Sequence, residues 1–221
     1  YKRIGWNARA QEGAVDGWYQ TKFTLKEEPL VSILIPNKDH TDDLDVCLNS
    51  FFERADYQNY EFIIIENNSV LPETFAYYEK IEKEHDNVKV VYWEAGFNYS
   101  TINNFGFKFA KGDYIMLLNN DVELITSDIF QSMLGFCMRP EVGIVGAKLL
   151  YNDHTVQHAG VLVGAGGLAD HVFKGIHEDD PGYMGRAISS QDVSAVTAAC
   201  LLVKRSVYEE VGGLEDEFQV A

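Results

Sequence analysis

Residues 114–121 read YIMLLNND, a run of five apolar side chains that ends in two amides and a carboxylate. A short, nearly continuous apolar run is typical of a strand buried on both faces of a parallel sheet. Three other stretches share this pattern: VSILIP at 31–36, EFIIIE at 61–66 and VKVVYW at 88–93. The sequence therefore predicts four buried strands.

Segments with helical spacing separate these strands. We expect Thr41 to cap a first helix, and residues 75, 78 and 81 to share one face of a second. Ser100 is the expected cap of a third helix, which ends at Lys111-Gly112, and Ser127 opens a fourth. Alternation of buried strands with amphipathic helices predicts an α/β fold with a mostly parallel central sheet.

Polar residues follow three of the four predicted strands. The clusters are Pro36-Asn37-Lys38-Asp39, Glu66-Asn67-Asn68-Ser69 and Asn119-Asn120-Asp121-Val122-Glu123. Each cluster alone is also an ordinary turn composition, because Asn and Asp are common turn residues. Ligands of open α/β sheets bind at the carboxyl ends of the strands, so the three clusters together predict a polar cleft.

Asp121 is the candidate metal ligand, because it follows a buried strand at the rim of the core. One carboxylate combined with ligand phosphates is the usual way in which proteins hold Mg²⁺ or Mn²⁺. The helix start near Ser100, Asn103 and Asn104 could attract a phosphate, although capping by Ser100 is the simpler interpretation.

The composition excludes several classes of function. With 18 Lys+Arg and 34 Asp+Glu the net charge is −16, which disfavours nucleic acid and anionic membranes. Hydrophobic residues make up 46%, enough for a folded core. The three cysteines, Cys47, Cys137 and Cys200, lie far apart without a Cys-x-x-Cys motif, which indicates a reducing compartment. No apolar run reaches the ~18 residues of a membrane span.

Two motifs resemble known sites but lack their context. The segment GAGGLA at 164–169 fits a dinucleotide fingerprint, but no helix pattern follows it, so we interpret it as a glycine turn. His154 and His158 have the spacing of a zinc protease, with His171 and His177 downstream. Thr155 stands where that motif requires Glu, so we expect ordinary hydrogen-bonding histidines.

The motifs occur in the order that is seen in family 2 glycosyltransferases. These motifs are VSILIP at 31–36, IIIENNS at 63–69, NFG at 104–106, AKGDY at 110–114, LNND at 118–121, RPEVG at 139–143, QHAG at 157–160, AVTAAC at 195–200 and GGL at 212–214. The chain resembles the branch that builds bacterial surface polysaccharides, including rhamnosyltransferase-like enzymes, over about residues 30–221.

The resemblance implies a GT-A fold, a nucleotide-sugar donor, inversion at the anomeric centre and a divalent metal, Mn²⁺ or Mg²⁺. Position by position, it places Asp121 on the metal and Asn119 against the ribose or the water shell of the metal. Asn119 stands where the family's Asp-x-Asp motif has its first carboxylate, and Asn103 stands where many members carry Arg. The residues implied around the nucleotide-sugar are Pro36, Asn37, Asp39, Glu66, Asn67, Asn104, Asn119 and Asn120.

The resemblance also implies where the catalytic base lies. Family members carry a segment like Phe-Asn-Asp-x-Asp shortly after the Gly-Gly motif, whereas this chain has GGLEDEF at 212–218 and ends at Ala221. We therefore expect the base beyond Ala221, with Glu215 and Asp216 as fallback candidates, and weak or no transfer by the chain alone.

The expected organisation is a lead-in at residues 1–30 that packs on a domain at 31–221. Within it, residues 31–123 form the nucleotide-sugar half and 124–221 an incomplete acceptor half of a longer protein. The implied acceptor is a glycan or lipid-linked glycan, and the implied location is the cytoplasm, with peripheral contact at the inner face of the membrane.

Two other functions stay open. A non-catalytic nucleotide- or glycan-binding module is favoured by Asn119, because an amide replaces a carboxylate. A nucleotidyltransferase would require a glycine-rich basic loop after the first strand, and PNKDH at 36–40 has no glycine.

Overall fold

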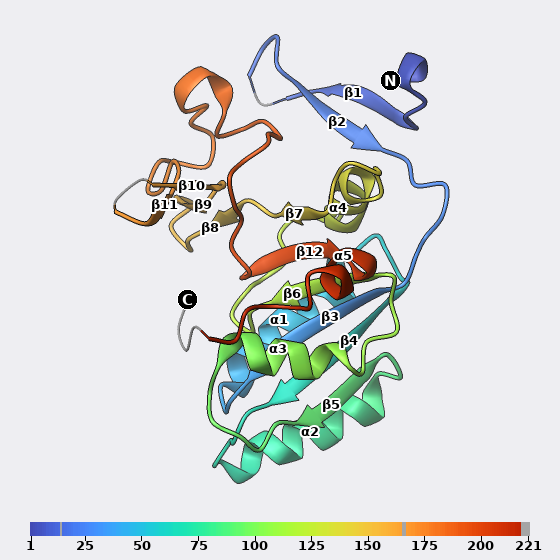
Figure 1. The fold of residues 1–221 in the computed structure, drawn as a ribbon, viewed down its shortest axis with the longest axis vertical. Helices are drawn as coiled ribbons and strands as arrows, with labels where there is room; N and C mark the ends of the chain where they lie inside the picture. Colours follow the sequence, from blue (N-terminus) through green and yellow to red (C-terminus); the bar gives the residue numbers. More distant parts are fainter. Residues whose placement is uncertain (14, 165–166, 218–221) are drawn as a thin grey trace.

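The centre of the computed structural model, which describes residues 1–13, 15–164 and 167–217, is a six-stranded sheet in the order β5-β4-β3-β6-β12-β7 (Figure 1). Its four parallel strands are β3 (Val31–Asn37), β4 (Tyr60–Glu66), β5 (Val88–Tyr92) and β6 (Tyr114–Leu118). These are the four strands that the sequence predicts, so the mostly parallel α/β fold is confirmed.

Two further strands extend the sheet beyond β6. Strand β12 (Cys200–Lys204) runs antiparallel to β6, with Leu202 opposite Met116, and β7 (Ile144–Gly146) pairs with the far side of β12. The apolar stretch at 193–203 therefore forms a strand only at its end. Before it, Ala195 bridges to Val161 of the second half, and the carbonyl of Ala199 accepts the backbone amide of Asn119, at the end of β6, at 3.0 Å.

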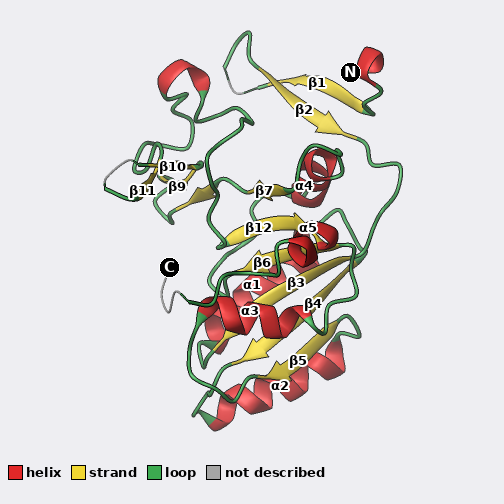
Figure 2. Cartoon of the chain, in the orientation of Figure 1, coloured by secondary structure: helices red, strands yellow, loops and turns green. Residues whose placement is uncertain are grey.

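Helices cover both faces of this sheet, as Figure 2 shows. One face packs against α1 (Thr41–Arg54), α2 (Pro72–Glu84) and α4 (Ile129–Cys137), and the other against α3 (Tyr99–Phe107) and α5 (Arg205–Glu210). Helix α3 lies so close to β4 that a Cβ on Gly106 would come within 2.3 Å of the Cδ1 atom of Ile65.

The helix starts differ from the predicted ones. Thr41 is the first residue of α1 and gives no side-chain cap. Asn98, not Ser100, caps α3, because its Oδ1 atom accepts the amide of Thr101 at 2.9 Å. This helix ends at Phe107, earlier than expected, and α4 begins two residues after Ser127, whose hydroxyl donates to Asp56.

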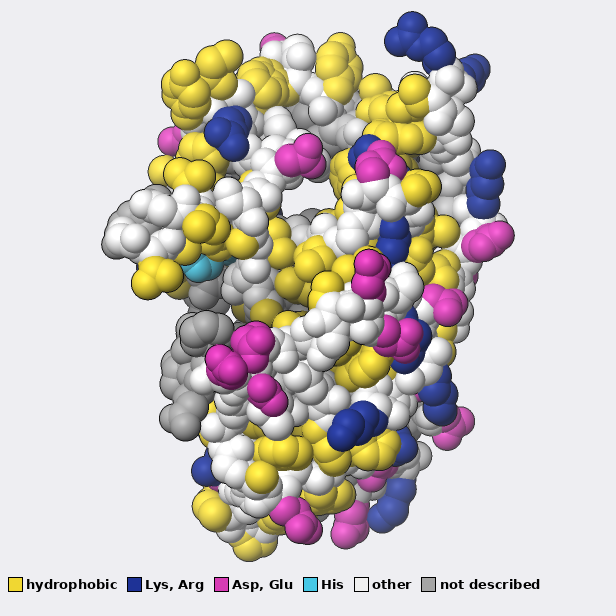
Figure 3. Space-filling model, viewed as in Figure 1, with side chains coloured by type: hydrophobic (Ala, Val, Ile, Leu, Met, Phe, Trp, Pro, Cys, Tyr) yellow, Lys and Arg dark blue, Asp and Glu magenta, His cyan; other side chains and the backbone are white. Residues whose placement is uncertain are grey.

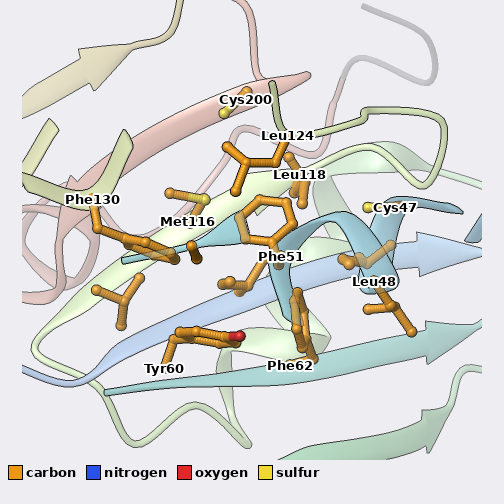
Figure 4. Close-up of a cluster of buried hydrophobic side chains, with 14 of the residues drawn as sticks. Cys47, Leu48, Phe51, Tyr60, Phe62, Met116, Leu118, Leu124, Phe130 and Cys200 are labelled. Carbon is orange, nitrogen blue, oxygen red and sulfur yellow. The ribbon is translucent and has the colours of Figure 1, made fainter. Parts of the chain in front are cut away.

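The core beneath α1 is aromatic (Figure 4). The ring of Phe51 meets Phe62 edge-on at 5.7 Å and Phe130 at 6.0 Å, and both partners are fully buried. Edge-to-face pairs of this kind add about 0.5–1.5 kcal/mol each beyond the area that they bury. These aromatic contacts pack α1 firmly against the sheet whose edge carries the polar residues.

The first thirty residues are more ordered than the sequence suggests. They form a short helix, η1 (Lys2–Ile4), and an antiparallel hairpin of β1 (Ala8–Glu12) and β2 (Tyr19–Phe23). The sequence shows no apolar period here because these strands are largely exposed and polar. Phe23 nevertheless anchors the hairpin on α4, where its ring lies 4.8 Å from Phe136.

The second half is built of short strands. Strands β8 (Leu149–Leu150) and β9 (Val156–His158) pair, as do β10 (Val161–Val163) and β11 (Ala169–His171), and η2 (Tyr183–Gly185) follows. The glycine-rich segment thus joins two antiparallel strands, with Ala165 and Gly166 outside the described residues. Figure 3 shows the molecule hollowed here, between α4 and the loop that precedes β12.

Among the described residues, no helix is both long and apolar enough to cross a bilayer. The three thiols are free and buried, and burial raises the pKa of Cys47 and of Cys200 to about 12.

Candidate functional site

The ends of β3 and β6 are joined by a hydrogen bond between two predicted site residues. The Nδ2 atom of Asn120 donates to the Oδ1 atom of Asn37 at 2.7 Å. Asn37 is 2% exposed, whereas Asn120 is half-buried at the edge. In the sheet, β3 lies between β4 and β6. The polar residues that follow these three parallel strands therefore meet at one edge, as the sequence predicts.

The end of β4 is tied to the same cluster through Glu66, which is 3% exposed. Its carboxylate accepts the amide of Ser69 at 2.6 Å and the hydroxyl of Ser69, and it also accepts the Tyr78 hydroxyl at 3.0 Å. Tyr78 in turn accepts from the Nδ2 atom of Asn37 at 2.7 Å, and burial raises its pKa. Glu66 is therefore occupied by protein donors.

Asp39 supports the start of α2. Its carboxylate accepts the amides of Val70 and Leu71 at 3.1 Å and the hydroxyl of Thr74 at 3.1 Å. Desolvation acts to raise the pKa of Asp39, but these donors together outweigh it and bring the pKa below its ordinary value. A carboxylate at a helix N-terminus is also favoured by the helix dipole. The backbone of Asp39 is left-handed, with φ at 53°, which turns the loop away from β3.

The remaining predicted residues near β3 and β4 border this cluster. Pro36 lies one residue before the end of β3, paired in register with Ile65 of β4. Asn67 is 4% exposed, and its amide N–H donates to the carbonyl of Asn37 at 2.9 Å. Its side chain and that of Asn68 both point at the carbonyl of Ala95.

Asp121 is exposed at the end of β6 and has no hydrogen bond or ion pair with any residue in the described part of the chain. The neighbouring carboxylate of Glu123 is instead paired with Arg54 at 2.8 Å. Among the two exposed carboxylates of this turn, Asp121 is thus the one that is available to a ligand.

A divalent cation fits this turn only with help from a ligand. The described residues contain no group of three or more His, Cys, Asp or Glu side chains that could hold a metal. Asp121 supplies one carboxylate, and Asn119 and Asn120 supply amide oxygens of the hard type that Mg²⁺ and Mn²⁺ prefer. Phosphate oxygens and water would have to complete the shell, which is common for Mg²⁺.

Asn104 lies elsewhere and holds the C-terminal segment. Its Nδ2 atom donates to the carbonyl of Leu214 at 2.8 Å, and its Oδ1 atom accepts the Tyr208 hydroxyl at 2.7 Å and the Leu214 amide at 2.9 Å. A nucleotide could reach this amide only by displacing these partners. Asn103 is fully buried, and its Oδ1 atom has no partner among the described residues.

Glu215 and Asp216 lie beside the start of α3. The backbone carbonyl of Asp216 accepts from the Nδ2 atom of Asn98 at 3.1 Å, and Glu215 accepts the amide of Asp216 at 3.0 Å. Both side chains are exposed. The segment expected to carry the base, beyond Ala221, lies outside the described residues.

Tyr78, Ser69 and Asn98 are the residues that the sequence analysis missed. Tyr78 was assigned only to the apolar face of α2, and a tyrosine at a core position gives no local sign of its hydrogen-bond partners. Ser69 was part of a polar cluster without a role. Asn98 could have been found, since Asn is among the preferred N-cap residues.

The histidines form hydrogen bonds, as expected. His158 is 1% exposed, its Nδ1 atom lies 3.0 Å from the Nδ1 atom of His171, and its Nε2 atom lies 3.4 Å from the amide of Thr197. Burial and the nearby His171 lower the pKa of His158 to about 4. His154 instead pairs with Glu178 at 2.8 Å.

Two cavities among the described residues lie away from this edge. One of about 290 Å³ lies at the opposite end of β6, beside Tyr114, Lys204 and Arg205. The other, about 280 Å³, opens in the second half beside Val161, Arg186 and Asp192. At the polar edge itself, Asp121 is exposed to solvent.

The sequence of the chain is similar to those of known bacterial proteins. The chain is 40% identical over 213 residues to uncharacterized protein y4gI of Sinorhizobium fredii, and 37% identical over 203 residues to O-antigen biosynthesis protein RfbC of Myxococcus xanthus. These matches span 95% and 91% of the chain but only 23% and 16% of the relatives.

The fold also has a counterpart among solved structures. A mannosyltransferase from Pyrobaculum calidifontis, in complex with GDP-Man and Mn²⁺, superposes with a TM-score of 0.62 at 12% identity, over 87% of this chain and 49% of that chain. The fold is therefore the GT-A fold. Residues 32–212 match the family described as Glycosyl transferase family 2, and the chain belongs to that family.

Proposed function

We propose that the chain binds a nucleoside-diphosphate sugar at the carboxyl edge of the sheet and transfers its sugar, with inversion, to a glycan or lipid-linked glycan acceptor. The observation that carries the proposal is that the polar ends of β3, β4 and β6 meet beside Asp121, a free carboxylate at the rim. The relationship to family 2 supplies the class of reaction.

Asp121, with the amide oxygens of Asn119 and Asn120, would hold Mn²⁺ or Mg²⁺ against the diphosphate. The ion would neutralise the charge that develops on the departing nucleoside diphosphate. Pro36, Asn37 and Asn67 would border the nucleoside. The mannosyltransferase that shares the fold is a complex with GDP-Man and Mn²⁺, which supports a metal-bound nucleotide-sugar as the ligand class.

The acceptor hydroxyl is a weak nucleophile, so transfer requires a carboxylate that takes its proton. We place this base beyond Ala221, and Glu215 and Asp216 are the fallback candidates within the described chain. The O-antigen relative supports an acceptor of the bacterial surface-polysaccharide type. We place the reaction in the cytoplasm at the inner face of the membrane, carried out by a longer protein with other domains.

A nucleotide screen tests the donor site. UDP, dTDP, GDP and CDP, each with Mn²⁺ or Mg²⁺, are added while thermal unfolding is followed. At a ligand concentration of 100 times Kd, binding to the folded state alone stabilises it by about 2.7 kcal/mol. Absence of any shift at millimolar concentration with all four nucleotides would contradict the proposal.

A non-catalytic binding module is the second candidate, because Asn119 and Asn120 supply amides beside a single carboxylate. The two candidates differ in turnover. A glycosyltransferase releases nucleoside diphosphate from a nucleotide-sugar in the presence of acceptor, whereas a binding module shows the same affinity without release.

A further inference from the structure

We propose that Asn37 is a positioning residue, which holds Asn120 so that the amide oxygen of Asn120, and not its NH₂ group, faces the ligand. The proposal rests on the proposed function for the identity of that ligand. It starts from the single hydrogen bond between the two side chains, in which the Nδ2 atom of Asn120 donates at 2.7 Å.

The orientation of the Asn37 amide follows from its other partners. Its Nδ2 atom lies 2.7 Å from the backbone carbonyl of Asp39, which can only accept a hydrogen bond. The NH₂ group of Asn37 must therefore point toward Asp39, and its oxygen must point toward Asn120. Since Asn37 is 2% exposed, no water is free to replace these partners.

A second chain of contacts enforces the same direction. The carboxylate oxygens of Glu66 accept hydrogen bonds from Ser69, and the hydroxyl of Tyr78 donates to the same carboxylate at 3.0 Å. The Tyr78 oxygen is then left to accept the second hydrogen of the Asn37 NH₂ group at 2.7 Å. The donors in this chain therefore all run from Asn120 toward Glu66.

The consequence appears at the rim. With its NH₂ group committed to Asn37, Asn120 presents Oδ1 on the other side of its amide, one residue before Asp121. An oxygen acceptor meets either a hydroxyl group or a cation, whereas an NH₂ group would meet a phosphate or carbonyl oxygen. The edge is thereby made selective for the sugar hydroxyls or the hydrated cation of a metal-bound nucleotide.

The substitution N120D tests this orientation without any ligand. It keeps the shape and the outward acceptor, but the introduced carboxylate faces the oxygen of Asn37 without a hydrogen to donate. We expect N120D to unfold about 2–6 °C below N120A at pH 7. Both variants lose the donor to Asn37, but only N120D sets a second acceptor against the Asn37 oxygen, and an unpaired acceptor costs about 1–3 kcal/mol. Equal or higher stability of N120D than of N120A would overturn the proposal.

Nucleotide affinity gives the second arm, with UDP, dTDP, GDP or CDP and Mn²⁺ as probes. A simple charge effect would tighten metal binding in N120D, because a second carboxylate joins Asp121. We expect the opposite, a Kd about tenfold higher at pH 7. The matched control is N87D, since Asn87 also donates to a carbonyl, that of Tyr60 at 3.2 Å, but at the opposite edge of the sheet. Its Kd should not change.

The two proposals fail separately. If the unaltered chain binds none of the nucleotides, the proposed function is wrong, while the unfolding comparison of N120D and N120A still decides how Asn120 is oriented. If nucleotides bind and N120D binds them as tightly as the unaltered chain at pH 7, Asn120 does not depend on Asn37 and the positioning role is wrong.

Discussion

The ring of Phe23 occupies the space that a side chain on Gly135 would need. A Cβ atom built on Gly135 would lie 2.1 Å from the Cγ atom of Phe23, well inside van der Waals contact. The hairpin of β1 and β2 therefore packs the ring of Phe23 into the space left on α4 by the missing side chain of Gly135, which we call the notch. The first thirty residues are attached to the domain through this notch, and the cation–π contact of Arg139 with Trp6 at 4.1 Å lies beside it.

We predict that G135A destabilises the chain, although alanine favours helices over glycine by up to about 1 kcal/mol. The added methyl group must displace Phe23, and overpacking of this kind costs about 1–3 kcal/mol. Urea unfolding would measure the loss. In the double variant F23A/G135A the two changes should be less than additive, because the smaller side chain makes room. G96A is the control, since nothing lies within 4 Å of a Cβ there; a stability loss equal in both glycine variants would contradict the notch.

We predict that D121N removes the metal dependence of nucleotide binding and leaves the fold intact. The carboxylate is exposed and bonded to no described residue, so its loss costs no packing, while the cation loses the one carboxylate of the Asn119-Asn120-Asp121 triplet. Calorimetric titration of nucleotide with and without Mn²⁺ measures the effect. E123Q is the matched control, because Glu123 is paired with Arg54. If D121N keeps the metal dependence and E123Q loses it, Glu123 is the ligand.

We predict that His158 makes the chain less stable in mild acid. Its pKa is lowered to about 4 in the folded state, against about 6.5 when unfolded, so the unfolded chain binds the proton more tightly. The stabilisation is complete above pH 6.5 and is lost as the pH falls toward 4, by up to about 3 kcal/mol. Unfolding free energies measured from pH 7 to 4 should fall less steeply in H158Q than in H154Q, which alters an exposed histidine. Parallel profiles would rule out this contribution.

We predict that transfer, unlike donor binding, requires chain beyond Ala221. General-base catalysis contributes typically 10²–10⁴-fold, so a chain without the base should bind nucleotide normally and transfer sugar very slowly. The comparison is between the 221 residues and a version extended by about a hundred residues, the size of a small domain. Equal transfer rates would place the base at Glu215 or Asp216, and E215Q and D216N would then tell them apart.

The sequence by itself determined the parallel part of the sheet and the edge at which the site lies. Runs such as residues 114–118 are apolar on both faces, and a segment of that kind can be buried only in the middle of an α/β sheet. The place of Asp121 at the rim follows directly, because the few residues after a buried strand are the first that can reach water. These features depend on local pattern, which a sequence displays.

Only the tertiary structure decided what the polar side chains do. Asn37, Glu66 and Asn104 all look like ligand residues in the sequence, yet each is bonded to protein groups from distant parts of the chain: Asn120, Tyr78 and Leu214. A hydrogen-bond partner is set by which strands are neighbours in the sheet, and the pairing of β12 with β6 joins residues more than eighty positions apart. The same is true of the hairpin, because Phe23, which anchors it on α4, is apolar without a period, and the space that it fills at Gly135 lies in a helix more than a hundred residues away.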